Sequence, residues 1–172
     1  MTTDLTIRCE RPDDAAVIAA TVAAAFGREA EAALVAALRD LDQLTVSLAA
    51  VLDDRIVGHV ALSPVAVDER SGDGHWLGLG PLAVQRGLQR QGIGRRLVDE
   101  AVATAAASGA SAVFVLGNSS YYGALGFEAA TDFGCRCVYD VPPAAFRVRR
   151  LGEPGNWPPP GTVTYHGAFA AL

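Results

Sequence analysis

A glycine-bearing turn with four arginines is the part of the sequence best suited to chemistry. It spans residues 85–96, follows the apolar segment 75–84, and contains Gly92 and Gly94. The first turn of a helix has unpaired N–H groups and a positive dipole end, so it binds phosphate. Glycines there remove Cβ atoms that would hold a ligand away from the backbone. Four arginine side chains can pair with phosphate oxygens: Arg86, Arg90, Arg95 and Arg96.

Two common phosphate motifs do not match this turn. A dinucleotide-binding motif needs a third glycine where Leu97 stands. A P-loop needs a lysine after glycine, and the chain contains none, because all 14 of its Lys-plus-Arg residues are arginine. The alternative to a ligand site is that Gly92 and Gly94 only allow a helix to pack tightly on a sheet.

The charge distribution agrees with one compact anion site. The 172 residues carry a formal charge of -5, which argues against general binding to nucleic acid, since that requires clustered cations. Residues 85–96 hold four arginines and no acidic residue, a local +4, so the other 160 residues carry -9. With 51% apolar and 19% charged residues, the chain has enough apolar side chain for a folded core.

Two spaced motifs together resemble a known family. Gln89-x-x-Gly92-x-Gly94 opens a helix directly after a strand, and the segment from Asn118 to Phe127 reads NSSYYGALGF. The pair is similar to the pyrophosphate loop and the Asn…Tyr-x-x-x-Gly-Phe segment of the GNAT superfamily of acetyl-coenzyme-A-dependent N-acyltransferases. The sequence of these segments resembles that of a bacterial branch of the family, whose substrates are mostly undefined. The likeness covers most of the chain and is strongest over residues 55–130.

The resemblance implies where coenzyme A (CoA) binds. The backbone of Leu82, Ala83 and Val84 would pair with the pantetheine arm, and an N–H near Leu82 would polarise the thioester carbonyl. Asn118 is a further cofactor contact, although it lies closer to Tyr122 than is usual in the family. The pyrophosphate would be held by the backbone N–H groups of one run of residues: Gln89, Arg90, Gln91, Gly92, Ile93, Gly94 and Arg95.

The 3′-phosphate of the cofactor would meet one of three arginines, and the sequence does not choose among Arg86, Arg90 and Arg95. Acetyl-CoA would serve as the acyl-donor substrate. No metal is expected, because the Cys135-x-Cys137 pair has no nearby His or Cys to complete a site. Cys9 makes the number of cysteines odd, which argues against a disulfide framework.

Acyl transfer requires a neutral amine and a proton donor for the departing thiolate. A primary amine with a pKa near 10.4 is neutral in only about one part in two thousand at pH 7, roughly 4.6 kcal/mol uphill. Tyr122 matches the position of the family's general acid; the alternative is a core aromatic residue. The family often places a glutamate on its central strands, but segment 75–84 has no carboxylate.

His59 and His75 are therefore the candidate general bases, because imidazole titrates near neutral pH. For either histidine a packing or surface role is the alternative. Glu69 and Asp73 fall in a turn and are expected to be solvated.

The resemblance implies an N-acetyltransferase that moves an acetyl or short acyl group to a primary amine of a small molecule or a protein. Direct attack in a ternary complex would carry the transfer. The alternative is a non-catalytic acyl-CoA sensor or partner-binding module on the same fold. The N-terminus lacks a secretory signal and no segment is apolar enough to span a bilayer, so we expect a cytoplasmic protein without membrane contact. A homodimer is common in the family.

Hydrophobic periodicity and turn residues predict one domain over residues 1–172 in the α/β or α+β class. The resemblance refines this to a central mixed, mostly antiparallel sheet with splayed central strands, flanked by about four helices. A polar turn at Asp53-Asp54 should join two strands as a hairpin. The expected strands are 5–8, 45–52, 56–67, 75–84, 112–116, much of 127–141, 146–151 and 162–169. The expected helices are 12–26, 29–39, 94–108 and 119–125.

Overall fold

The computed structural model describes residues 4–68 and 75–172, so the turn predicted to contain Glu69 and Asp73 lies outside the described residues. The chain divides into two compact units. The first comprises residues 1–62, 81–101 and 167–172; the second comprises 63–80 and 102–166. Because each unit is assembled from separate stretches of chain, neither is a contiguous segment of sequence. The single domain over 1–172 stays a prediction.

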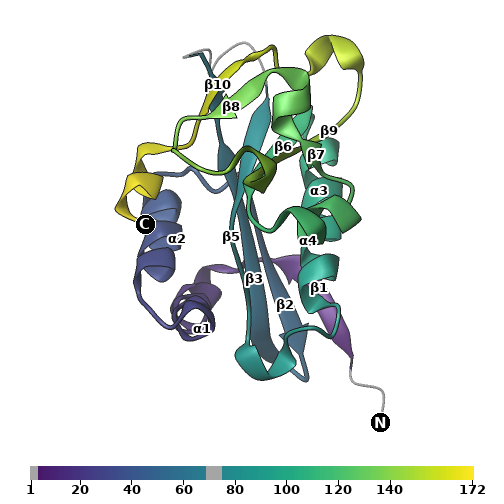
Figure 1. Cartoon of the computed structure of the whole chain (residues 1–172). Helices are drawn as coiled ribbons and strands as arrows, with labels where there is room; N and C mark the ends of the chain where they lie inside the picture. Colours follow the sequence, from purple (N-terminus) through teal and green to yellow (C-terminus); the bar gives the residue numbers. More distant parts are fainter. Residues whose placement is uncertain (1–3, 69–74) are drawn as a thin grey trace. The chain divides into compact units, whose positions relative to one another are not determined.

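The first unit contains an antiparallel sheet in the order β1-β2-β3, with the last residues of β5 beside β3 (Figure 1). The Asp53-Asp54 hairpin is confirmed: Leu52 pairs with Arg55, and both aspartates have positive φ, as a tight hairpin turn requires. The elements of this unit, three of which (β3, β5 and α3) are shared with the second, are β1 (Leu5–Cys9), α1 (Ala15–Phe26), α2 (Ala30–Asp40), β2 (Val46–Leu52), β3 (Arg55–Pro64), β5 (Trp76–Val84) and α3 (Ile93–Ala107).

An apolar cluster joins the two N-terminal helices to the end of β5. Ile18 and Val22 of α1 pack with Ala32 and Val35 of α2 and with Ala83 of β5. Ile18 and Val22 have no exposed surface, so each contributes on the order of 1.5–3 kcal/mol through burial. The alanine-rich faces allow the helices to approach closely, and this packing fixes α1 against the strand that the cofactor is expected to contact.

The second unit contains the first residues of β5, which run parallel to β6, followed by β9 and β7 in antiparallel pairing. A separate three-stranded sheet has the order β4-β10-β8. The further elements of this unit are β4 (Ala66–Val67), β6 (Ala112–Leu116), α4 (Ser119–Ala124), β7 (Glu128–Ala129), β8 (Cys135–Cys137), β9 (Phe146–Arg150) and β10 (Gly161–Thr164).

The C-terminal third was predicted less well than the rest. The segment 127–141 was expected to be mostly extended, but it holds only the short strands β7 and β8 around a 3₁₀ turn at Ala130–Phe133. The last strand ends at Thr164 instead of Phe169, and a 3₁₀ turn occupies Gly167–Ala171. These segments are short and apolar without a clear period, so their sequence does not distinguish a strand from a turn.

Gly78 is a glycine because an aromatic ring lies where its side chain would be. A Cβ at this position would overlap the Tyr165 ring and a methyl group of Val65. The ring belongs to a residue 87 positions away in the chain.

We predict that Gly78→Ala lowers the free energy of unfolding by about 1–3 kcal/mol, since the added methyl group overpacks a buried site. Urea denaturation would measure this change. Gly155→Ala is the matched control, because a Cβ there meets no atom within 4 Å and φ is not in the left-handed region. Equal stability of the two variants would contradict the assigned packing.

Candidate active site

The strand β5 continues beyond its pairing with β6. Trp76 to Leu79 pair in parallel with Ala112 to Val115, and the pairing stops there although β5 continues to Val84. Residues 80–84 therefore have no strand partner on that side in the described part of the chain. This is the divergence of central strands that was expected, and it leaves backbone polar groups that another partner must satisfy.

The three residues expected to contact pantetheine, Leu82, Ala83 and Val84, differ in the side of β5 to which their backbone N–H and C=O groups point. The Gln85 N–H donates to the Val57 carbonyl at 2.8 Å, so Gln85 and Ala83 turn their polar groups toward β3. Leu82 and Val84 turn theirs to the other side. The Val84 carbonyl accepts a hydrogen bond from the Gln89 side chain at 3.0 Å, so half-buried Leu82 has the backbone best placed for a ligand.

The turn after β5 leads directly into a helix start. A short 3₁₀ turn covers Arg86–Leu88, Gly92 takes φ +85°, and α3 begins at Ile93. The Gly92 carbonyl accepts the Arg96 N–H at 3.1 Å, which makes Gly92 the cap of α3 and leaves the first N–H groups of the helix without intrahelical partners. Ile93 is buried and anchors this turn, whereas Gln89, Arg90, Gln91 and Gly92 are exposed.

The three arginines that are candidates for binding the 3′-phosphate differ in the protein contacts that they already make. The Arg86 Nε donates to the Ala25 carbonyl near the end of α1 at 3.4 Å, and Arg95 lies 3.8 Å from the Asp99 carboxylate one helical turn away. Arg90 makes no hydrogen bond or ion pair with any described residue. Its φ of +62° is unusual for a residue with a side chain. The conformation of the turn thus leaves the Arg90 guanidinium available.

Tyr122 lies in the second unit on α4. The Asn118 side-chain oxygen caps this helix by accepting the Tyr121 N–H at 2.9 Å, which gives Asn118 a structural role beside its predicted cofactor contact. The Tyr122 ring is 8% exposed and meets the rings of Tyr121 and Phe127 edge-on, with centroids 5.0 and 5.6 Å away. Burial, with a smaller contribution from Tyr121, raises the pKa of Tyr122 well above its usual value. The phenol therefore stays protonated at neutral pH, as a proton donor must.

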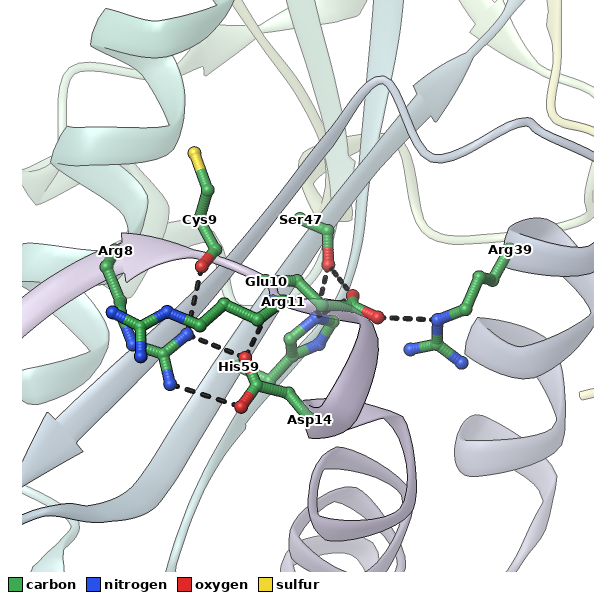
Figure 2. A network of polar contacts seen from close by, with 8 residues as sticks. All are labelled: Arg8, Cys9, Glu10, Arg11, Asp14, Arg39, Ser47 and His59. Atoms are coloured by element: carbon green, nitrogen blue, oxygen red, sulfur yellow. Dashed lines mark hydrogen bonds and ion pairs between the residues drawn. The ribbon is translucent and has the colours of Figure 1, made fainter.

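His59 on β3 is fully buried in a polar network that Figure 2 shows. Its Nε2 lies 2.8 Å from the Ser47 hydroxyl and 3.7 Å from the Glu10 carboxylate. Glu10 also accepts from Ser47, and its other oxygen accepts from the Arg39 Nε at 2.5 Å. The network links β1, β2, β3 and α2, and it favours a structural role for this histidine.

The pKa of Glu10, the acidic residue of this network, is strongly shifted. Burial raises the pKa of Glu10, but the nearby His59 imidazole and the hydrogen bonds from Arg39 and Ser47 outweigh it and lower the pKa to about 2. No sequence signal grouped these residues, because Glu10 follows β1 while Arg39, Ser47 and His59 lie on α2, β2 and β3. The other candidate base, His75, is half-buried and immediately precedes β5, at the opposite end of that strand from Leu82.

Within the described residues no three His, Cys, Asp or Glu side chains gather as a metal site would require. Cys9, Cys135 and Cys137 are free thiols. None of the described helices is both long and apolar enough to cross a membrane.

A diverging strand followed by a glycine turn at a helix start is the arrangement that the two motifs predicted. Residues 15–127 match the model of the acetyltransferase (GNAT) family. Together with a relative 38% identical over 95% of the chain, this match shows that the chain belongs to the GNAT family, a family of acetyltransferase enzymes.

Particular relatives extend the likeness to nearly the full length. The chain is 38% identical over 164 residues to the uncharacterized N-acetyltransferase YhbS of Escherichia coli K12, covering 97% of that protein. The crystal structure of Escherichia coli YhbS in complex with CoA matches with a TM-score of 0.93 at 36% identity, over 99% of this chain and 94% of that one. A GNAT family acetyltransferase from Brucella melitensis in complex with acetyl-CoA matches with a TM-score of 0.82 at 35% identity, over 97% and 99%. The fold is therefore the GNAT fold.

We predict that Glu10 makes stability depend on pH in the acidic range. Its pKa is lowered in the folded state from 4.5 to about 2, so the stabilisation is present above about pH 5 and is lost as pH falls toward 2. The loss should be about 3 kcal/mol in the free energy of unfolding, measured by urea denaturation at several pH values. In Glu10→Gln this pH dependence should be smaller by that amount, whereas the exposed Glu153→Gln should keep it. Parallel pH profiles of the natural chain and Glu10→Gln would contradict the assignment.

Proposed function

We propose that the protein transfers an acetyl or short acyl group from acyl-CoA to a primary amine. The observation that carries the proposal is the unpaired end of β5 leading into the glycine turn at the start of α3. Membership of the GNAT family and two structural relatives in complex with CoA or acetyl-CoA support it. The proposal treats residues 1–172 as one acyltransferase domain that acts in the cytoplasm.

The cofactor would bind along these two features. The Leu82 backbone would pair with pantetheine and its N–H would polarise the thioester carbonyl, since the neighbouring Ala83 turns toward β3. The N–H groups from Gln89 to Arg95 would hold the pyrophosphate at the positive end of α3. Arg90 would meet the 3′-phosphate, because Arg86 and Arg95 already have partners.

The reaction would proceed by direct attack. The amine nitrogen forms a bond to the thioester carbonyl carbon, the carbon–sulfur bond breaks, and the CoA thiolate leaves. Tyr122 would supply the proton to the sulfur, because its phenol is protonated at neutral pH. The phenol would then recover a proton from solvent or from the proton released by the amine.

No side chain is assigned as the general base. His59 is buried and held by Ser47 and Glu10. His75 lies just before the first residue of β5, whereas Leu82 lies near the last residue of that strand. We therefore propose that the acceptor loses its proton to water before attack. The rate should then increase with pH as the amine is deprotonated.

Titration calorimetry with CoA and with dephospho-CoA, which lacks the 3′-phosphate, tests the cofactor site. We predict that Arg90→Met weakens CoA binding about tenfold and leaves dephospho-CoA binding unchanged, since one charge-assisted contact is lost. Arg95→Met is the matched control in the same turn and should change CoA affinity less. No detectable CoA binding by the natural chain would contradict the proposed function. An equal loss for both ligands would contradict only the assignment of Arg90.

We predict that Tyr122→Phe lowers kcat at least about a hundredfold, because the departing thiolate loses its proton donor. The measurement is thiol release from acetyl-CoA with a panel of polyamines, aminoglycosides and peptides that have a free N-terminus or lysine. The affinity for CoA should not change. CoA binding without turnover on any amine would favour the non-catalytic sensor instead, and an unchanged kcat would exclude Tyr122 as the acid.

A further inference from the structure

The backbone of Tyr122 is held by two residues of the turn that follows α4. The N–H groups of Leu125 and Phe127 both donate to the Tyr122 carbonyl, each at 3.0 Å. The Phe127 ring also lies edge-on to the Tyr122 ring. The position of the candidate acid therefore depends on where this turn is fixed.

Two arginines of β9 bind the same two residues. The Arg147 Nη2 donates to the Phe127 carbonyl at 2.9 Å, and the Arg149 Nη1 donates to the Leu125 carbonyl at 3.2 Å. Leu125 and Phe127 thus each use their N–H to hold Tyr122 and their carbonyl to accept from an arginine. Since the two arginines are two residues apart on one strand, they lie on the same face of the sheet.

The strand that carries these arginines is firmly placed within the unit. Arg147 pairs with Val115 and Arg149 pairs with Val113 of β6, while Arg147 also pairs with Ala129 of β7. The β9 strand is therefore bonded on both sides, and it lies beside α4. A rigid strand thereby determines the position of a six-residue helix that is too short to be stable alone.

Charge and space suit this contact. The two guanidiniums bind at the carbonyl end of α4, where the helix dipole favours cations. The Arg147 Nη2 lies 3.4 Å from the place that a Cβ on Gly123 would occupy, and the Arg149 guanidinium lies 3.7 Å from the corresponding place on Gly126. The guanidiniums thus lie at van der Waals distance from these two glycines.

We propose that Arg147 and Arg149 are positioning residues for Tyr122, acting through the carbonyls of Phe127 and Leu125. The inference rests on the proposed function, in which Tyr122 is the proton donor. It assigns to β9 a part in the reaction that neither motif of the sequence indicated.

The test combines hydrogen exchange with a double-mutant cycle on the full chain. Amide exchange over residues 119–127 is measured for Arg147→Met, Arg149→Met and Arg147→Lys. Arg136→Met is the matched control, because Arg136 is an exposed arginine of β8 in the same unit. The kcat for thiol release from acetyl-CoA, with the amine panel above, is measured for the same variants and for Arg147→Met combined with Tyr122→Phe.

We expect exchange over 119–127 to increase about tenfold in Arg147→Met and Arg149→Met, with no change in Arg136→Met. The kcat should fall about tenfold in the same two variants while CoA affinity is kept, and Arg147→Lys should recover part of it. In the Tyr122→Phe background, Arg147→Met should cause no further loss.

Unchanged exchange over 119–127 in both methionine variants would overturn the inference whatever their activity. Losses that multiply in the double variant would also overturn it, because Arg147 would then act independently of Tyr122. A Tyr122→Phe variant as active as the natural chain would overturn the proposed role of Tyr122 as the acid. This single variant tests that role independently of the arginine variants.

Discussion

The backbone of β5 imposes the constraint on which the cofactor site depends. A strand that loses its neighbour leaves N–H and C=O groups that protein or ligand must satisfy. Beyond Leu79 the chain satisfies only part of this demand, through β3 and through the Gln89 side chain at Val84. Leu82 is left turned away from β3, and the same strand then leads into a helix start with its own unpaired N–H groups. Strand and helix thus offer consecutive polar surfaces to one extended, phosphate-bearing ligand.

The N-terminal helices are tied to this strand and its turn by both apolar and polar contacts. Ala83 packs with Ile18 and Val22, and Arg86 reaches the Ala25 carbonyl near the end of α1. Ala83 and Arg86 lie on either side of the start of the turn that leads from β5 into α3. A displacement of α1 would therefore move this turn directly. Arg86 therefore has a structural role that its positive charge alone did not reveal.

Partly buried charged groups in both units serve to place secondary structure. The carboxylate of Glu10 gathers donors from β2, β3 and α2, and a pair of arginines on β9 fixes the turn after α4. The Glu10 carboxylate accepts from two side chains at once, whereas each arginine satisfies one carbonyl, so removing any of these groups leaves a polar partner unpaired. Such groups define the relative position of elements that are too short or too alanine-rich to be held by apolar packing alone.

The sequence by itself determined the family, the glycine turn at the start of α3, the Asp53-Asp54 hairpin and the order of most elements, because these depend on neighbouring residues and on short-range periodicity. Only the tertiary structure decided that Ala83 turns away from the open side of β5, that Arg86 binds α1, and that His59 is enclosed with Glu10. It also decided that Tyr165 fills the space at Gly78 and that Arg147 supports Tyr122 through Phe127. These contacts join residues 20 to 87 positions apart. No local pattern encodes such pairs, since they are set by how the sheet brings distant strands together.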